Sequence, residues 1–314
     1  MSNQTVGNES TSGRKIGFIG LGAMGSPMAC RLVDAGYETS VYDVVPERVE
    51  ALVTRGARAA SSPRDAAEES NIVITMLPDS GDVLSAVGGS DGVLAGLRAG
   101  SVVIDMSTIS PAVTRAVAHQ AAERGGRMVD APVGRTSRHA EEGDLLVMIG
   151  GEEPVIDEVD PVLACFGKDR VRCGPIGSGE TMKLVNNLLT ATIVAANAEA
   201  LVLGVKAGLD LQTVLSVLRA TAASNTHLRA TYAEKALRRD FRPGFATRLA
   251  VKDLRLAISL AVDEQLPVAL GAAALQMFST ACSEGHGGED YTSVLTVLER
   301  LAGVELKEQV VTAR

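Results

Sequence analysis

The chain has 314 residues, a formal net charge of −8 at pH 7 and 46% hydrophobic residues. The hydrophobic content excludes intrinsic disorder for most of the chain. The acidic balance disfavours proteins that grip nucleic acid along its backbone, and a chain with no Trp, four Tyr and five Phe has little material for stacking on bases. At roughly 150 residues per domain, the length predicts two domains.

No apolar run approaches the roughly 20 uncharged residues of a membrane span. Residues 1–13 are polar, lack the apolar core of a secretory signal and are expected to form a loose tail. The four Cys show neither a C-x-x-C pair nor a Cys/His spacing typical of zinc sites. The scattered cysteines predict reduced thiols, no metal site and a cytoplasmic location. The acidic charge and the lack of a membrane span predict that neither nucleic acid nor membrane is a partner.

The first half of the chain alternates between strand and helix patterns. An apolar run at 15–19 leads into a glycine-rich loop and a helical pattern, and a second strand at 39–42 ends at Asp43. Further strand patterns cover 72–76, 102–106, 128–130 and 145–149. Strands that alternate with helices predict a mostly parallel, doubly wound sheet with helices on both faces.

The pattern changes near residue 175, after which no strand is predicted. Helical patterns cover about 182–205, 210–221, 226–238, 246–264, 269–285 and 290–302. We predict an α/β domain over residues 14–175 and an all-α domain over residues 176–302. Residues 303–314 are expected to be a flexible end.

A glycine-rich loop follows the first strand. Gly20 permits a tight turn, Gly22 lets the backbone approach a pyrophosphate, and Gly25 allows close packing of helix on strand. The amides of this loop, which also contains Ala23 and Met24, would point at the phosphates. A strand before the loop and a helix after it favour a dinucleotide site over a glycine turn without a ligand.

Asp43 ends the second strand, where an acid can accept hydrogen bonds from the adenosine ribose hydroxyls and repel a 2′-phosphate. The following Val44 and Val45 offer no cation for such a phosphate. The sequence therefore favours NAD(H) over NADP, although an acid here can also be an ordinary turn residue or helix cap.

Two further strands end in segments that can reach the cofactor, since ligands of doubly wound sheets lie across the carboxyl ends of the strands. These segments are Met76, Leu77 and Pro78 after the third strand, and Ser107 and Thr108 after the fourth. A helix cap is the alternative for the two hydroxyl residues.

Lys183, Asn186 and Asn187 interrupt an otherwise apolar helical pattern. Positions i, i+3 and i+4 share one face of a helix, so an ammonium and two amides would lie together. Lys183 can give a proton to a carbonyl oxygen while a hydride arrives at carbon, and the amides can orient the substrate. The alternative is a satisfied polar cluster between domains, since buried polar groups need partners.

A loop with anion-binding side chains follows the strand at 128–130. Its members are Gly134, Arg135, Thr136 and Ser137. The guanidinium of Arg135 can hold an anionic oxyacid through a fork of N–H donors. The alternative is an Arg that is only solvated at the surface. None of the four His has an evident catalytic partner by spacing, so we interpret them as surface or structural residues.

The run from Gly17 to Met28 resembles the N-terminal signature of the β-hydroxyacid dehydrogenases, a family that includes 3-hydroxyisobutyrate dehydrogenases and tartronate semialdehyde reductases. Four more segments match in the family's order, and the match covers about residues 15–300: Asp105-Met106-Ser107-Thr108, Asp130-Ala131-Pro132-Val133, Gly177 to Asn187, and Lys252-Asp253-Leu254. The resemblance implies a Rossmann domain, a long linking helix and an all-α domain that often forms homodimers or homotetramers.

The resemblance also implies roles for individual residues. Lys183 matches the family's catalytic Lys, with Asn187 and Asn186 as its substrate-orienting amides. The segment with Ser107 and Thr108 matches the one near nicotinamide and substrate. Lys252 matches a Lys of the α-domain that reaches the cofactor.

The substrate loop departs from the family's common Ser-Gly-Gly, since Gly134, Arg135 and Thr136 occupy those positions. This version, with Ser137 after it, resembles the sulfolactaldehyde reductases of the family, as does Pro243-Gly244-Phe245. We therefore expect Phe245 and this loop to bind substrate, with 3-sulfolactaldehyde and 2,3-dihydroxypropane-1-sulfonate as the first candidate pair. A carboxylate substrate such as 3-hydroxyisobutyrate or tartronate semialdehyde is the alternative, because residues 137–144 carry more charge than that branch predicts.

The expected activity is an NAD-dependent reductase or dehydrogenase for a small anionic 3-hydroxy acid. Imine reduction, which a related fold supports, is disfavoured by Lys183, because those proteins generally lack this Lys. A non-catalytic dinucleotide-binding protein is disfavoured by the same Lys and by the acidic charge.

Overall fold

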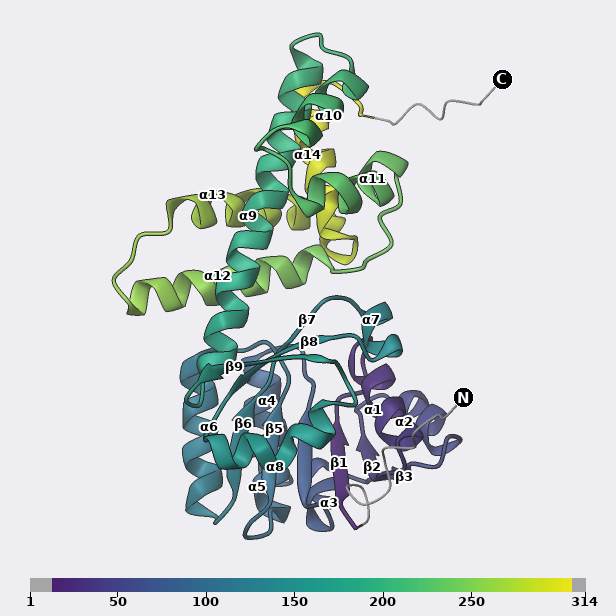
Figure 1. The fold of residues 1–314 in the computed structure, drawn as a ribbon, viewed down its shortest axis with the longest axis vertical. Helices are drawn as coiled ribbons and strands as arrows, with labels where there is room; N and C mark the ends of the chain where they lie inside the picture. Colours follow the sequence, from purple (N-terminus) through teal and green to yellow (C-terminus); the bar gives the residue numbers. More distant parts are fainter. Residues whose placement is uncertain (1–12, 307–314) are drawn as a thin grey trace, which may run out of the picture. The chain divides into compact units, whose positions relative to one another are not determined.

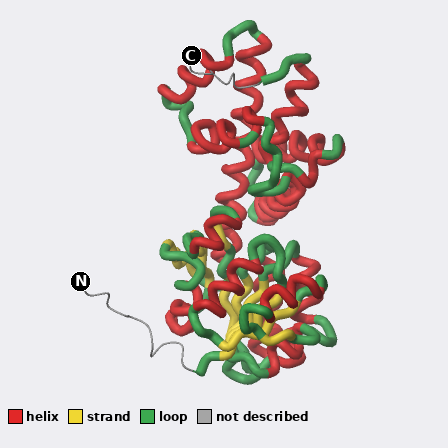
Figure 2. The backbone as a smooth tube through the Cα atoms, turned by 90° about the vertical axis from the view of Figure 1, so that its right-hand side faces the viewer, coloured by secondary structure: helices red, strands yellow, loops and turns green. Residues whose placement is uncertain are grey.

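The computed structural model describes residues 13–306. The predicted tail at 1–13, apart from Gly13, and the end of the chain after Leu306 lie outside the described residues. The chain divides into two compact units at Lys183 and Leu184, a point that lies inside one long helix. The first unit holds the sheet and the second is helical (Figures 1 and 2).

A single sheet forms the centre of the first unit. Its strands are β1 (Lys15–Ile19), β2 (Glu38–Tyr42), β3 (Arg58–Ala59), β4 (Ile72–Thr75), β5 (Val102–Asp105), β6 (Arg127–Asp130), β7 (Val133–Gly134), β8 (Leu146–Gly150) and β9 (Asp169–Gly174). They are ordered β3-β2-β1-β4-β5-β6-β8-β7, and β9 pairs with β8. The strands from β1 to β6 pair in parallel, whereas β8 runs antiparallel to β6 and β7. The mostly parallel, doubly wound sheet is thus confirmed.

The register brings the ends of the central strands to one edge. Ile19 lies opposite both Tyr42 and Thr75, Thr75 lies opposite Asp105, and Asp105 lies opposite Asp130. The order reverses at β1, which sends β2 to one side and β4 to the other. Loops after these strands therefore meet where doubly wound sheets bind ligands.

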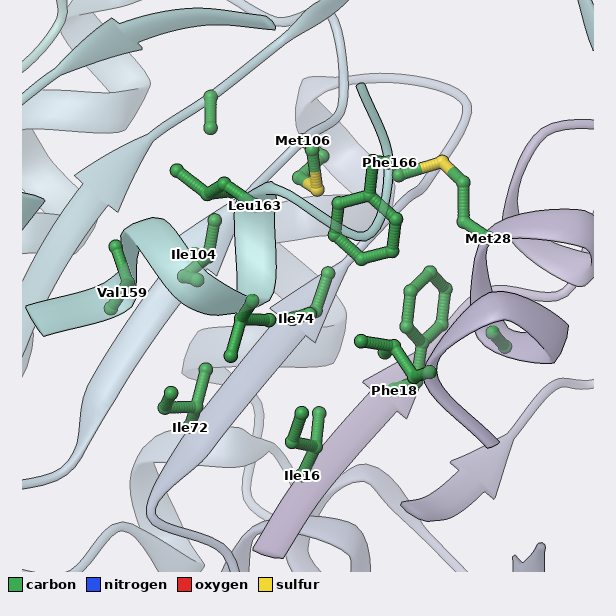
Figure 3. Packing of buried hydrophobic residues seen from close by; sticks show 14 of the residues in the cluster. Ile16, Phe18, Met28, Ile72, Ile74, Ile104, Met106, Val159, Leu163 and Phe166 are labelled. Atoms are coloured by element: carbon green, nitrogen blue, oxygen red, sulfur yellow. The ribbon is translucent and has the colours of Figure 1, made fainter. Parts of the chain in front are cut away.

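Helices cover both faces of this sheet. They are α1 (Gly25–Asp34), α2 (Pro46–Val53), α3 (Pro63–Glu68), α4 (Ser80–Gly88), α5 (Val93–Gly96), α6 (Pro111–Glu123), α7 (Ser137–Glu142) and α8 (Glu153–Leu163). Alternate strand residues point to opposite faces, so one core contains Phe18, Ile74 and Ile104, and the other contains Val73 and Val103. Figure 3 shows the first core, in which Phe18, Ile74 and Ile104 pack with Leu163 and Phe166.

The second unit is built on α9 (Ser178–Lys206), whose first turns belong to the first unit. The other helices are α10 (Leu211–Ala220), α11 (Tyr232–Glu234), α12 (Thr247–Asp263), α13 (Ala269–Ser283) and α14 (Val294–Ala302). A π-helical turn (His227–Thr231) precedes α11, and short 3₁₀ turns cover Ala236–Arg238, His286–Gly288 and Tyr291–Ser293. Their shared core includes Val194, Leu215, Tyr232, Leu254 and Phe278.

Two expectations for this unit need correction. The single helix predicted over 226–238 is interrupted at Lys235, which leaves the helical conformation; a π-helical turn continues into α11 before it, and a 3₁₀ turn follows it. The expected flexible end is wrong for its first residues, since Leu306 is buried and its amide donates to Glu299 at 2.5 Å.

Among the described helices, α9 is long and apolar enough by length and composition to cross a membrane. The same property is typical of a helix that passes through a protein core. Val194, Ala198 and Leu201 of α9 are buried in the core of the helical unit, so packing accounts for part of its apolar composition.

Candidate active site

The glycine loop between β1 and α1 has the geometry of a dinucleotide site. Gly20 has a φ of +95°, and a Cβ there would lie 2.3 Å from the carbonyl oxygen of Met76. A Cβ on Gly25 would lie 1.9 Å from the carbonyl oxygen of Gly20. The space beside Gly22 is open within 4 Å, so this backbone can be approached closely.

The amides of Gly22, Ala23, Met24 and Gly25 have no acceptor within the part of the chain that the structure describes. They lie at the start of α1, where the helix dipole favours negative charge. Open space and four free N–H donors together fit a pyrophosphate. The loop therefore fits the cofactor that the sequence predicts.

Asp43 is held against this loop. One carboxylate oxygen accepts the amide of Leu21 at 2.6 Å, and the other accepts the amide of Val45 at 2.8 Å. Arg48, in the first turn of α2, lies 3.2 Å from the same carboxylate. Val44 and Val45 offer no cation, but α2 brings Arg48, which lies beyond them in the chain, next to Asp43. Asp43 can accept hydrogen bonds from ribose hydroxyls, and Arg48 is a cation that could pair with a 2′-phosphate.

The loops after β4 and β5 are tied together. Ser107 Oγ accepts the amide of Leu77 at 2.9 Å, and the Ser107 amide donates to Asp105 at 3.1 Å. Thr75 donates to the same Asp105 oxygen at 2.9 Å. Ser107 is fully buried while Thr108 is partly exposed. Ser107 therefore holds the segment of Met76, Leu77 and Pro78 in place, and Thr108 is the better placed of the two hydroxyls for contact with a ligand.

Asp105 is fully buried, and its second carboxylate oxygen has no hydrogen-bond partner among the described residues. Burial raises the pKa of Asp105, although the hydrogen bonds from Ser107 and Thr75 oppose the shift. The neighbouring charge of Asp130 raises it further. Burial thus favours the neutral form of this carboxyl group.

Asp130, at the end of β6, anchors the start of α9. Its two carboxylate oxygens accept the amides of Gly177 at 2.7 Å and Glu180 at 2.8 Å. Burial raises the pKa of Asp130, and these amide donors oppose that shift. Glu180 is itself buried and accepts the amide of Ile109 at 3.2 Å. The first turn of α9, which leads to Lys183, is therefore fixed to the sheet.

The loop after β7 places Arg135 at the surface, where its side chain is ion-paired. Its guanidinium contacts the carboxylates of Asp144 at 2.8 Å and Asp169 at 2.5 Å. Its φ of +77° is a conformation that favours glycine. Thr136 Oγ1 lies 2.9 Å from His139 Nδ1. Arg135 therefore braces the β7, β8 and β9 edge.

Gly134 and Ser137 flank this loop. Gly134 is buried at the end of β7, and Ser137 begins α7 and is partly buried. The sequence-predicted anion loop is thus compact, with its backbone fixed between a strand and a helix.

The predicted polar face of α9 is present. Lys183, Asn186 and Asn187 follow one another at helical spacing, and Lys183 is partly buried. Asn186 Nδ2 donates to Asn187 Oδ1 at 2.9 Å. Asn187 Nδ2 donates to Asp253 of α12 at 2.6 Å. The orientation of the Asn187 amide is therefore set, with its oxygen toward Asn186.

Asp253 was not predicted as a site residue. It is 3% exposed, and Lys252 Nζ lies 2.9 Å from its second oxygen. One buried carboxylate thus connects Asn187 with Lys252. The available signal was its place directly after Lys252 in a matching segment, but the spacing within α12 does not reveal a partner on α9.

Phe245 precedes α12 and is partly buried. The amides of Gly244 and Phe245 donate to Asp290 at 2.9 and 3.3 Å. Its ring meets Tyr291 edge to face, with centroids 5.6 Å apart. The Phe245 ring, which the sequence predicts to bind substrate, is therefore held by Asp290 through the backbone and by Tyr291 through an aromatic contact.

These features define a class of protein. The strand order, the turn at Gly20 and the free amides at the start of α1 are those of a dinucleotide-binding Rossmann domain. The helix that follows carries a Lys with two amides on one face.

Comparison with known proteins places the chain more closely. Residues 15–177 match the family model for the NAD binding domain of 6-phosphogluconate dehydrogenase. Residues 177–298 match the model for the NAD-binding domain of NADP-dependent 3-hydroxyisobutyrate dehydrogenase. The chain belongs to the β-hydroxyacid dehydrogenase family and is 3-hydroxyisobutyrate dehydrogenase-like.

Relatives span nearly the whole chain. It is 40% identical to the 2-(hydroxymethyl)glutarate dehydrogenase of Eubacterium barkeri, over 93% of this chain and 97% of that protein. It is 38% identical to the 3-sulfolactaldehyde reductase of Escherichia coli, over 93% and 98%. The solved 3-hydroxyisobutyrate dehydrogenase of Mycobacterium tuberculosis, with L-serine, has a TM-score of 0.83 at 32% identity and covers 91% of this chain and 99% of its own.

Imine reductases with 20–22% identity share the fold alone.

The family models and the hydroxy-acid dehydrogenases among the relatives show that the protein is an NAD-dependent oxidoreductase that acts on CH–OH groups.

Proposed function

We propose that the protein interconverts a small anionic aldehyde and its 3-hydroxy acid with NAD(H), with Lys183 as general acid and base. The observation that carries this proposal is the polar face of α9. Lys183 lies one helical turn before Asn187, and the buried Asp253 fixes the Asn187 amide.

NAD(H), which the glycine loop at Gly20–Gly25 and Asp43 would hold, would supply the hydride-transfer chemistry between the carbonyl and hydroxyl forms of the substrate. Lys183 gives a proton to the carbonyl oxygen during reduction and removes it during oxidation. Asn187 and Asn186 orient the substrate, because their amides are held in one arrangement. Thr108 lies at the strand-end edge, where the cofactor is expected.

The first candidate substrate pair is 3-sulfolactaldehyde and 2,3-dihydroxypropane-1-sulfonate. Gly134, Arg135, Thr136 and Ser137 support it, since a sulfonate has three acceptor oxygens that suit N–H and O–H donors. The Escherichia coli relative, which is named for this activity, supports it as well.

A carboxylate substrate is the second candidate, and the ion pairs of Arg135 favour it. With its guanidinium between Asp144 and Asp169, the side chain is less available to a sulfonate. The Eubacterium barkeri relative is named for a dicarboxylate, 2-(hydroxymethyl)glutarate. 3-Hydroxyisobutyrate and tartronate semialdehyde are also carboxylates and belong to this second candidate class.

NAD-linked oxidation of a panel of hydroxy acids separates these candidates. The panel contains 2,3-dihydroxypropane-1-sulfonate, 3-hydroxyisobutyrate, glycerate, L-serine and 2-(hydroxymethyl)glutarate, each followed by the absorbance of reduced nicotinamide. The proposal expects at least about a hundredfold higher kcat/KM for the sulfonate. A preference for a carboxylate would move the assignment to the second candidate, and no turnover of any member would refute the proposed reaction.

We also propose a homodimer or homotetramer in the cytoplasm. The exposed apolar side chains Met182, Val185 and Leu189 on one face of α9 support self-association. The four unpaired cysteines support a reducing compartment. Light scattering of the purified full chain tests the assembly, and a monomer at micromolar concentration would refute it.

A further inference from the structure

Three aromatic rings from distant parts of the second unit lie edge to face. Phe245 meets Tyr291 with centroids 5.6 Å apart and planes at 85°. Tyr291 in turn meets His227 with centroids 6.1 Å apart and planes at 87°. Tyr291 is 8% exposed, so it forms the buried middle of a row that ends at a predicted substrate-binding ring.

Polar contacts fix the buried end of this row. Tyr291 Oη lies 3.1 Å from His227 Nδ1, and Thr231 Oγ1 lies 3.3 Å from the same nitrogen. Burial raises the pKa of Tyr291 and lowers the pKa of His227. At neutral pH the phenol therefore keeps its proton and the imidazole is neutral, and the tautomer of His227 sets which of the two groups donates.

The backbone at the other end is fixed as well. Asp290 accepts the amides of Gly244 and Phe245, and the Tyr291 amide donates to the Phe245 carbonyl oxygen at 2.9 Å. His227 begins a π-helical turn, a distortion that is frequent at functional sites. The position of the Phe245 ring is thus set by Tyr291 from the side and by Asp290 from the backbone.

We propose that Tyr291, supported by His227, is a positioning residue that holds the Phe245 ring as a rigid wall and so limits the size of the substrate. The proposal rests on the proposed function and on the expectation from the sequence that Phe245 binds substrate. Edge-to-face aromatic pairs favour one ring orientation. A ring that loses this contact can turn away and admit a longer substrate.

A double-mutant cycle tests whether Tyr291 acts through Phe245. The proteins are wild type, Phe245→Ala, Tyr291→Leu and the double variant, with Tyr291→Phe as the control that keeps the ring and loses the hydroxyl. Each is assayed with 2,3-dihydroxypropane-1-sulfonate and with the longer 2-(hydroxymethyl)glutarate. Thermal unfolding and NADH binding are measured for every variant.

Tyr291→Leu should shift the kcat/KM ratio about fivefold toward the longer substrate, and Tyr291→Phe should fall between it and wild type. In the Phe245→Ala background, Tyr291→Leu should change the ratio by less than about twofold, because the residue through which it acts is gone. Effects that simply add, or an equal loss on both substrates, would overturn the proposal.

A second measurement needs no turnover. With five Phe in the chain, ¹³C-labelled phenylalanine gives a small set of ring signals, and Phe245→Leu identifies the one from Phe245. Tyr291→Leu should lower the order parameter of this ring in the ligand-free protein, and Tyr291→Phe should lower it less. An unchanged order parameter would overturn the proposal even where activity falls. Failure of all the hydroxy acids would count against the proposed reaction, and the ring measurement would still decide the positioning.

Discussion

The carboxylate of Asp130 accepts the backbone amide of Glu180 at 2.8 Å, and this bond joins the end of a central strand to the first turn of α9. The same carboxylate accepts the amide of Gly177 at 2.7 Å. Strand and helix are therefore joined where the chain turns toward Lys183. The position of the proposed catalytic Lys thus depends on a buried acid that itself has no role in the chemistry.

Asparagine substitutions at Asp105 and Asp130 should destabilise the protein to different extents, although the two residues lie opposite each other on β5 and β6. In Asp130→Asn one of two backbone amides loses its acceptor, which should cost about 1–3 kcal/mol of unfolding free energy. In Asp105→Asn the oxygen that accepts from Thr75 and Ser107 is kept, so the loss near pH 5 should stay below about 1 kcal/mol. Urea unfolding measures both, and equal losses would contradict this account.

The stability of the wild type should fall with rising pH across the titration of Asp105. Burial raises the pKa of this carboxyl above that of the unfolded chain. Between the unfolded value, about 3.9, and the raised folded value, the folded protein binds more protons, so its stability decreases as pH rises. Asp105→Asn should remove part of this decrease, and the variant should gain on the wild type as the pH rises above the unfolded value of about 3.9. Parallel pH profiles would show that folding does not shift the pKa of Asp105.

Asp253→Ala should lower kcat/KM about 10- to 100-fold, because the Asn187 amide and Lys252 lose their shared partner. Asp263→Ala is the matched control, since Asp263 is an exposed acid on the same helix. Steady-state kinetics with the preferred hydroxy acid measure both variants. Equal activity of the two would mean that the position of Asn187 does not depend on Asp253.

Arg135→Gly should raise KM for a sulfonate about tenfold more than for a carboxylate. The fold should tolerate glycine, because φ at this position is +77°. Arg135→Ala is the control that removes the guanidinium and keeps a side chain at this φ. If KM rises equally for the sulfonate and the carboxylate, Arg135 only braces the sheet edge through Asp144 and Asp169.

Arg48→Ala should weaken NADPH binding about tenfold and NADH binding less than about threefold. The reason is that Arg48 lies beside Asp43, where a 2′-phosphate would need a cation. Fluorescence titration of reduced nicotinamide measures both affinities without substrate. An equal change for the two cofactors would show that Arg48 serves only to hold Asp43.

The sequence predicted the parts of this molecule that rest on local patterns. Buried parallel strands such as Ile72–Thr75 are continuous apolar runs, and the glycine loop has a fixed spacing, so both were found. The two-residue strands Arg58–Ala59 and Val133–Gly134 are too short to show a pattern. The edge strand Asp169–Gly174 carries charged, exposed residues typical of a loop, so it was missed.

Site residues that depend on distant partners could not be predicted. Lys183, Asn186 and Asn187 share one helix, and their spacing alone predicts a common face. Asp253 lies 66 positions from Asn187, and Asp169 lies 34 positions from Arg135. No local spacing predicts these pairs, because the fold alone brings them together. Tyr291, which packs against Phe245, lies 46 positions later in the chain. Local spacing does not predict this contact either.

The most direct test of the central claim is the turnover of Lys183→Ala beside wild type, with NADH affinity measured on the same samples. Lys168→Ala, which changes an exposed Lys of the first unit, is the control. The account predicts a loss of about 10²–10⁴ in kcat for Lys183→Ala, NADH binding within about threefold of wild type, and an unchanged Lys168→Ala. A Lys183→Ala enzyme that still oxidises its hydroxy acid at a rate near wild type would contradict the assignment of Lys183 as the acid and base of this reaction.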